Sequence, residues 1–145
     1  HEEWGLEEPR IALCALNPHA SDDGLFGDEE ARVFAPALAR LQRAGIAAAG
    51  PLPADTVFGL ALGGGYDAVV SPYHDVGMAA FKTAAFGTGV NVTLGLPFVR
   101  TSPDHGTAFA LAKTPGQADP SSMLEALRLA KTLTHNRFDT ESRDV

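Results

Sequence analysis

Three histidines and a nearby aspartate are the residues of this sequence whose types suit a metal site. His19 and His74 each follow a short apolar run, and His105 lies in a polar turn later in the chain. Imidazole is the commonest transition-metal ligand near neutral pH, and Asp75, beside His74, can bind a metal or orient the imidazole. Taken alone, each histidine is more commonly a structural residue, and the sequence has no HxxxH or HExxH spacing. The histidines therefore indicate a metal only through their shared context.

A second group of polar residues suits a small anion. Arginine gives bidentate hydrogen bonds to a phosphate or carboxylate, and lysine supplies a point charge. Lys82, Asn91 and Arg100 have these properties, although residue type alone is explained more simply by solvated ends of a helix and a strand. Asp55 suits a helix cap and an acid–base group equally well. No GxGxxG or P-loop motif is present, so the residues themselves give no support to a Rossmann cofactor site.

Most of these polar residues follow the predicted end of a strand. Apolar, strand-like runs cover residues 10–16, 46–50 and 67–71;. They precede His19, Asp55 and His74, respectively. Ligands of α/β proteins collect beyond the carboxyl ends of the strands, so the pattern predicts one shared site.

The remaining pattern alternates helices with strands. The stretch after the acids 28–30 predicts a helix ending near Arg43, and Gly50–Pro53 predicts a stiff turn before a helix capped by Asp55 or Thr56;. The second half predicts a helix at 77–85, strands at 90–94 and 97–101, and a last helix opened by Asp119 and Pro120;. We find no repeat or linker, so residues 1–145 are predicted to form one α/β domain.

Composition excludes several classes of partner. The chain has 145 residues, a net charge of −7 and eleven scattered Lys and Arg residues, which excludes the basic footprint of a nucleic-acid-binding protein;. No apolar run reaches the roughly 18 to 20 residues of a membrane span. The single cysteine, Cys14, lies in an apolar run where packing is expected, which favours a reducing cytoplasm;. The chain lacks an initiator Met, so we expect a fragment of a longer protein.

Five blocks in register resemble the C-terminal half of the 4-hydroxythreonine-4-phosphate dehydrogenase family, and the resemblance covers nearly the whole chain. They are NPHA at 17–20, GPLPADT at 50–56, YHD at 73–75, VNVTLGLPFVRTS at 90–102 and DHGTA at 104–108. The resemblance implies an α/β three-layer sandwich of the isocitrate and isopropylmalate dehydrogenase type. It also implies a homodimer whose active site lies between the subunits.

The resemblance also implies roles for individual residues. His19 and His74 match two of the three histidines that bind a divalent metal (Zn, Mg, Co or Mn), and the family's third histidine lies upstream of residue 1. The substrate-binding residues of the family correspond to Lys82, Asn91 and Arg100, and the catalytic ones to Asp55, Asp75 and Lys82. The loop that embraces the adenosine part of NAD or NADP corresponds to Asp104, His105, Gly106, Thr107 and Ala108.

By the same resemblance, the reaction is the NAD-dependent oxidation and decarboxylation of 4-phosphonooxy-L-threonine to 3-amino-2-oxopropyl phosphate, in pyridoxal phosphate (vitamin B6) biosynthesis. The chain alone is expected to be inactive because a metal ligand lies outside it. Three departures from the family pattern are visible: residues 20–24 read ASDDG in place of AGEGG, Val76 replaces Gln, and Ala110 and Lys113 replace Asp and Gly. The lost Asp at 110 leaves cofactor affinity open.

Two alternatives stay open from the sequence. A dehydrogenase of a phosphorylated sugar acid, such as threonate or erythronate 4-phosphate, would keep the metal and the NAD and change the substrate pocket. A non-catalytic ligand-binding or dimerisation module would agree with Val76, Ala110 and the missing third histidine. A panel of substrates would distinguish the first alternative from a 4-hydroxythreonine-4-phosphate dehydrogenase. A test for NAD reduction would distinguish the second alternative from both enzymes.

Overall fold

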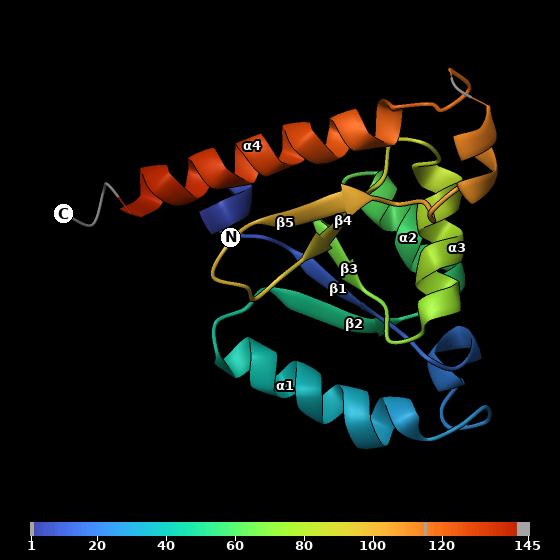
Figure 1. The fold of residues 1–145 in the computed structure, drawn as a ribbon. Coiled ribbons are helices and arrows are strands. Elements are labelled where there is room, and N and C mark those ends of the chain that lie inside the picture. Colours follow the sequence, from blue (N-terminus) through green and yellow to red (C-terminus); the bar gives the residue numbers. More distant parts are fainter. Residues whose placement is uncertain (1, 115, 142–145) are drawn as a thin grey trace. The chain divides into compact units, whose positions relative to one another are not determined.

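The computed structural model describes residues 2–114 and 116–141 (Figure 1). The chain divides into two compact units, and each is described by itself. One, called here the parallel-sheet unit, is Leu6–Ala80. The other, the hairpin unit, consists of the described residues of His1–Gly5 and Phe81–Val145.

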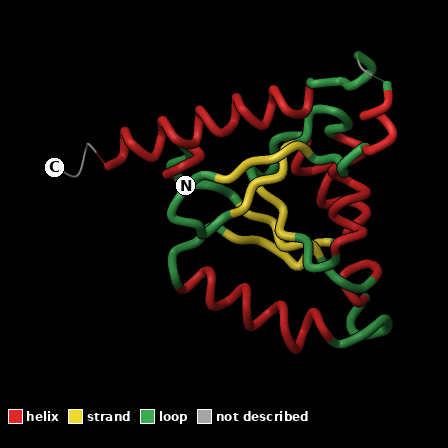
Figure 2. The backbone as a smooth tube through the Cα atoms, in the orientation of Figure 1, coloured by secondary structure: helices red, strands yellow, loops and turns green. Residues whose placement is uncertain are grey.

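Three parallel strands form the centre of the parallel-sheet unit. They are β1 (Ile11–Cys14), β2 (Ala48–Leu52) and β3 (Ala68–Val70), in the order β2-β1-β3. Parallel neighbours need crossover connections, and the helical segments supply them: η2 (Pro18–Ser21), η3 (Glu30–Phe34), α1 (Ala35–Arg43) and α2 (Ala54–Leu62). Figure 2 shows strands in yellow and helices in red. The predicted parallel α/β arrangement of this half is therefore present.

The core of this unit lies between β1 and α2. Side chains of a strand alternate between its two faces, so Ala12 and Cys14 point to the same side. There they meet Val57 of α2, and all three are fully buried. Burial raises the pKa of the Cys14 thiol, although a hydrogen bond with Ser71 opposes the shift. Cys14 has the packing role that the sequence predicted.

An ion pair ties the starts of β1 and β3 together. Both carboxylate oxygens of Asp67 accept hydrogen bonds from the Arg10 guanidinium, at 3.0 and 2.9 Å, and Oδ2 also accepts the Arg10 backbone N–H at 2.8 Å. The Arg10 side chain, followed by its backbone N–H, lowers the pKa of Asp67 to about 2. The pair is exposed, so its contribution to stability is modest.

The lowered pKa predicts how the pair responds to acid. Because the folded-state pKa of Asp67 lies below its unfolded value, its contribution is present at neutral pH and is lost between about pH 5 and pH 2;. Asp67→Asn should therefore lower the urea midpoint of the full-length protein most at neutral pH and progressively less in acid. Urea unfolding of both proteins from neutral pH into acid checks this. A difference that stays constant with pH would contradict it.

The hairpin unit is built from two antiparallel strands and a long helix. The strands are β4 (Val90–Thr93) and β5 (Arg100–Pro103), with Thr93 opposite Arg100. The helix α4 (Ser121–Glu141) packs on them through buried Ala126 and Leu133, and Thr101 Oγ1 donates to the Ala126 carbonyl at 2.9 Å (Figure 1). Short 3-10 turns are η1 (Glu2–Trp4) and η4 (Phe109–Lys113). The helix α3 (His74–Ala84) runs from one unit into the other.

Several predicted boundaries are wrong, and each has a local cause. Pro51 and Leu52, predicted as part of a turn, belong to β2; this is an edge strand, where the missing proline N–H costs no ladder hydrogen bond;. Gly50 fits there because a Cβ would meet the Leu13 carbonyl oxygen at 2.6 Å;. The N-cap of α2 is Pro53, and neither Asp55 nor Thr56 is.

In the second half, three elements begin at other residues than predicted. The helix α3 begins at His74 and not at Gly77, because the N–H of Gly77 already bonds the Tyr73 carbonyl and closes a turn. The strand β5 runs Arg100–Pro103 in place of 97–101. The helix α4 begins at Ser121, one residue after the predicted first position Pro120, and Asp119 Oδ1 accepts the Ser121 N–H at 2.9 Å. Among the described residues, no helix has the length and apolar character needed to cross a membrane.

Candidate functional site

Four of the predicted site residues lie at one edge of the parallel sheet, the edge formed by the carboxyl ends of its three strands. His19 follows β1, Asp55 lies in the first turn of α2 after β2, and His74 and Asp75 open α3 after β3. All three strands run in the same direction, so their carboxyl ends share this edge;. The four side chains are exposed, and Asp75 accepts a hydrogen bond from the Tyr73 hydroxyl at 3.1 Å. The strand-end pattern of the sequence therefore leads to one edge.

His19 is held on a left-handed stretch of backbone. Residues 19–23 are not glycine and all have positive φ, from 47° at Asp22 to 72° at Ser21. Positive φ costs a residue with a Cβ about 1 to 2 kcal/mol, and single residues rather than runs usually adopt it. The family pattern AGEGG has glycine where this chain has Ser21 and Asp23, so in this chain residues with a Cβ adopt the left-handed conformation at those two positions. The His19 ring also meets Phe26 edge-on, with centroids 6.2 Å apart.

A buried carboxylate holds the segment before this turn. Glu30 Oε1 accepts the backbone N–H groups of Leu16 and Asn17 at 2.9 and 2.8 Å, and Oε2 accepts Asn17 Nδ2 at 2.8 Å. Glu29 also accepts from Asn17 Nδ2, at 2.7 Å. Gly27 passes so close that a Cβ would meet Asn17 Nδ2 at 2.6 Å. These contacts fix the chain two residues before His19.

Glu30 stays ionised despite its burial. Burial alone would raise its pKa, but the hydrogen bonds from Asn17 and Leu16 outweigh that effect and lower it;. The sequence assigned Glu30 only to the acidic start of a helix, so this role was missed. The sequence did hold a signal for this role: a polar residue, Asn17, follows the first strand, and acidic residues begin the helix that comes next.

The described residues do not form a complete metal site. In residues 2–114 and 116–141, no group of three or more His, Cys, Asp or Glu side chains is placed to hold an ion. His19 and His74 supply two imidazoles at the sheet edge, with Asp75 beside one of them. This donor set suits a divalent transition metal in kind but does not complete a site.

In the hairpin unit, Asn91 and Arg100 share a face. Asn91 pairs with Ser102 and Thr93 pairs with Arg100, so these four side chains project from the same side of the two strands;. Asn91 and Arg100 are exposed, and Arg100 Nη1 donates to Thr93 Oγ1 at 2.8 Å. The opposite face, with Thr101, packs on α4. The hairpin therefore presents an amide and a guanidinium on the same face.

Lys82 lies against a different predicted residue. Its Nζ donates to both the carboxylate and the carbonyl oxygen of Asp104, each at 2.7 Å. Asp104 follows β5 directly, and the buried Ser122 of α4 bonds to it. These three residues line a pocket of about 180 Å³, together with Phe86, Gly87, His105 and Asp119. The structure thus joins a predicted substrate residue to a predicted cofactor residue.

Ser122 is a second residue that sequence reasoning missed. It is buried on the same helix side as Ala126 and Leu133, at spacings of four and seven residues;. A polar side chain on the buried stripe of a helix usually has a hydrogen-bonding partner, and that was the available signal.

The rest of the predicted cofactor loop is open to solvent. His105, Gly106, Thr107 and Ala108 are exposed, and His105 Nδ1 lies 2.9 Å from the Gly106 carbonyl oxygen. Ala108 has a φ of 49° and immediately precedes η4.

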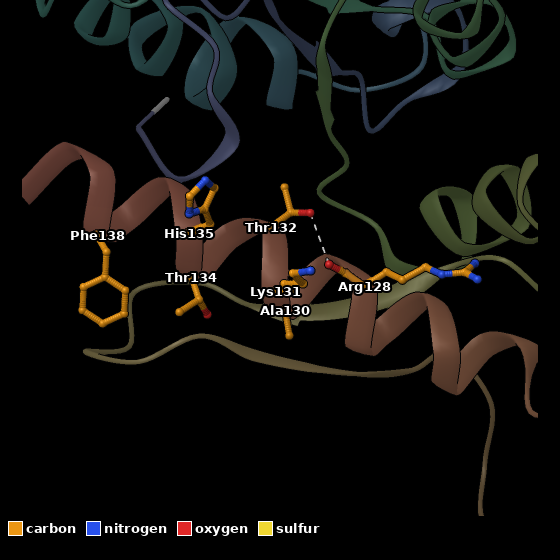
Figure 3. Close-up of a pocket in the computed structure, with 7 residues that line it drawn as sticks. All are labelled: Arg128, Ala130, Lys131, Thr132, Thr134, His135 and Phe138. Atoms are coloured by element: carbon orange, nitrogen blue, oxygen red, sulfur yellow. Dashed lines mark hydrogen bonds between the residues drawn. The ribbon is translucent and has the colours of Figure 1, made fainter.

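A further depression lies along α4 and holds none of the predicted site residues (Figure 3). Its lining consists of Arg128, Ala130, Lys131, Thr132, Thr134, His135 and Phe138. In Figure 3 these side chains project from one helix, with Thr132 bonded back to the Arg128 carbonyl. We assign it no part in the candidate site.

Known proteins resemble this chain over most of its length. Residues 1–130 match the family described as pyridoxal phosphate biosynthetic protein PdxA. The 4-hydroxythreonine-4-phosphate dehydrogenase of Xanthobacter autotrophicus is 54% identical over 140 residues, which cover 97% of this chain and 39% of that protein. The one from Geobacter metallireducens is 57% identical over 122 residues, 84% of this chain and 36% of that protein. The chain thus spans about two fifths of the length of these curated relatives.

Solved structures agree with the sequence match. The 4-hydroxythreonine-4-phosphate dehydrogenase of Klebsiella pneumoniae has a TM-score of 0.81 at 50% identity, over 90% of this chain and 39% of that one. A terephthalate 1,2-cis-dihydrodioldehydrogenase of Burkholderia xenovorans has a TM-score of 0.66 at 33% identity, over 88% of this chain and 40% of that one. The predicted α/β fold is confirmed. The chain belongs to the PdxA family, to which its five sequence blocks had pointed.

Proposed function

We propose that the full-length protein is an NAD-dependent 4-hydroxythreonine-4-phosphate dehydrogenase of pyridoxal phosphate biosynthesis. Hydride passes from C3 of 4-phosphonooxy-L-threonine to NAD while the C3 hydroxyl loses its proton. The resulting β-keto acid loses carbon dioxide, and protonation of the enolate gives 3-amino-2-oxopropyl phosphate. The strongest support is the 54% identity to a dehydrogenase of this name over 97% of the chain.

The substrate carries two anionic groups, a phosphate and a carboxylate, and the hairpin unit offers side chains that can bind such groups. Arg100 and Asn91 share an exposed face, where a guanidinium and an amide can together bind a phosphate or carboxylate;. Lys82 adds an ammonium at a pocket wall. We assign these three residues to substrate binding and give Lys82 a catalytic role as well.

The cofactor and the metal have separate sets of residues. Dehydrogenases of this family imply a nicotinamide cofactor, and we assign the exposed loop His105–Ala108 to the adenosine part of NAD or NADP. His19 and His74 are assigned as two ligands of a divalent cation (Zn, Mg, Co or Mn), with at least one ligand outside the described residues. Asp55 and Asp75, on the same sheet edge, are the candidates for proton transfer;.

The wider assignment follows the family resemblance. Residues 1–145 form the C-terminal portion of a metal- and NAD-dependent dehydrogenase, which acts in the cytoplasm as a homodimer with its active site between subunits. The described residues hold no complete ligand set for the metal, so we expect the chain by itself to be inactive.

One structural neighbour acts on a different class of substrate, so other substrates are considered as well. The Burkholderia xenovorans protein shares the fold at 33% identity and is a dehydrogenase of a dihydrodiol. The fold therefore accommodates more than one hydroxyl-bearing substrate. A phosphorylated sugar acid such as threonate or erythronate 4-phosphate would use the same anion-binding residues. A non-catalytic ligand-binding module is the remaining alternative.

NADH formation by the full-length protein is the experiment that separates these functions. With 4-phosphonooxy-L-threonine and NAD, we expect turnover that disappears after chelation and returns when a divalent metal is added. Absorbance at the NADH band follows the reaction directly. Turnover only with threonate or erythronate 4-phosphate would select the second function. A folded protein that binds phosphate esters and reduces no NAD would contradict both.

A further inference from the structure

Two hydrogen bonds hold the Lys82 ammonium group, whereas a lysine that only supplied a positive charge to a substrate would need none. Both bonds are 2.7 Å long and go to one residue, to the side chain and the backbone carbonyl of Asp104. The Asp104 side chain is only 6% exposed, whereas that of Lys82 is 37% exposed. An ammonium has three protons, so this arrangement leaves one for a ligand. The lysine therefore reaches the pocket from a fixed anchor.

The anchor is itself fixed from α4. Ser122 Oγ accepts the Asp104 backbone N–H at 3.3 Å, and its single proton faces Asp104 Oδ1 at 3.1 Å and the Gly89 carbonyl at 3.3 Å. The hydrogen bond from Lys82 lowers the pKa of Asp104, against the opposing effect of burial. Asp104 is therefore a carboxylate at neutral pH, with both oxygens engaged.

We propose that Asp104 is a positioning residue: it holds the Lys82 ammonium in one orientation at the pocket for an anionic, phosphate-bearing ligand, and Ser122 holds Asp104. This assignment rests on the proposed function for the identity of the ligand. It separates Asp104 from the exposed loop His105–Ala108, to which the sequence had joined it. A free lysine loses rotamer freedom when it binds a phosphate, and an anchored lysine has already lost it.

Simple electrostatics predicts the opposite of this proposal, which makes a charge-removing variant decisive. A carboxylate beside a phosphate site repels the phosphate, so its removal alone should tighten phosphate binding. Loss of the anchor should instead weaken it. Asp104→Asn keeps the side-chain volume and one acceptor oxygen and removes the charge. Asp119→Asn is the matched control, because Asp119 lines the same pocket and bonds Ser121 at the start of α4.

The measurement uses inorganic phosphate as the probe on the full-length protein, so it does not require turnover. Phosphate should protect Lys82 from acetylation, measured by peptide mass spectrometry. We expect the phosphate concentration for half-protection to rise about tenfold in Asp104→Asn, and less than twofold in Asp119→Asn. Unchanged or tighter binding in Asp104→Asn would overturn the proposal, as would a wild-type protein in which phosphate gives Lys82 no protection.

Steady-state kinetics then distinguish positioning from cofactor binding. In Asp104→Asn the KM for the phosphorylated substrate should rise about tenfold while the KM for NAD changes less than twofold. A rise confined to the KM for NAD would overturn the proposal and return Asp104 to the cofactor loop. If the wild type fails to turn over 4-phosphonooxy-L-threonine, the proposed function fails, and the protection assay still decides the role of Asp104. Ser122→Ala should move both readouts in the same direction by a smaller factor.

Discussion

Replacing Glu30 by alanine is expected to lower the free energy of unfolding by about 2 to 4 kcal/mol, because it removes the acceptor of three hydrogen bonds at once. The N–H groups of Leu16 and Asn17 and the Asn17 amide lose the carboxylate that they contact at 2.8 to 2.9 Å. Half-buried donors without a partner cost more than the bond itself contributes. Urea unfolding of the full-length protein measures the loss, and hydrogen exchange at Leu16 and Asn17 locates it.

Glu29→Ala is the matched control for this prediction. Glu29 is the adjacent residue and is of the same type. It accepts one hydrogen bond, from the side-chain amide of Asn17, and that amide also donates to Glu30. Its removal should cost well under half as much and should leave the Leu16 and Asn17 amides protected. Equal losses in the two variants would mean that the strand end is held by something other than the Glu30 carboxylate.

Acid should reproduce part of the Glu30 effect. The pKa of Glu30 is lower in the folded protein than its ordinary value, so its contribution is present above that ordinary value and declines as the pH falls below it;. As the pH falls below 4.5, the protection factors of the Leu16 and Asn17 backbone amides, which are corrected for the intrinsic pH dependence of exchange, should therefore decline;. This dependence is absent in Glu30→Ala.

The sequence predicted those parts of the fold that depend on local pattern. Apolar runs located β1 and β3, and Asp119 with Pro120 located the start of α4, because strand burial and helix capping are written in neighbouring residues;. The strand-end rule placed His19, Asp55 and His74 on one edge without any structural information. The presence of these strands and of this helix, and the edge of the sheet at which these three residues lie, could therefore be predicted from the sequence.

The parts that were missed depend on contacts between distant residues. Pro51 and Leu52 look like part of a turn, and only their place on an edge strand beside β1 shows why they extend β2. The partnership of Lys82 with Asp104 joins residues 22 positions apart, and no periodicity encodes it. Resemblance had given those two residues to different ligands. The tertiary hydrogen bonds therefore show a partnership that residue type alone does not reveal.

The two histidines at the sheet edge carry the largest expected effect on binding of a metal. Loss of an outer-shell partner costs a metal site about 10- to 100-fold in affinity, so loss of a ligand should cost at least about 100-fold. We expect His74→Ala and a His19 variant of the full-length protein to lose their divalent metal on dialysis, and NADH formation with it. Metal content by mass spectrometry is the primary readout, because it does not depend on the substrate being the right one.

The choice of the His19 variant follows from its backbone. His19 has a φ of 51°, and alanine would add strain there that has nothing to do with a metal;. Asparagine tolerates this conformation well, so His19→Asn removes the imidazole and keeps the turn. His135→Ala, on α4, is the control and should keep its metal. Retention of metal by both His19→Asn and His74→Ala would remove these residues from the ligand set. Loss of metal in Glu30→Ala as well, with His19 intact, would show that the buried carboxylate acts by holding the turn that presents the imidazole.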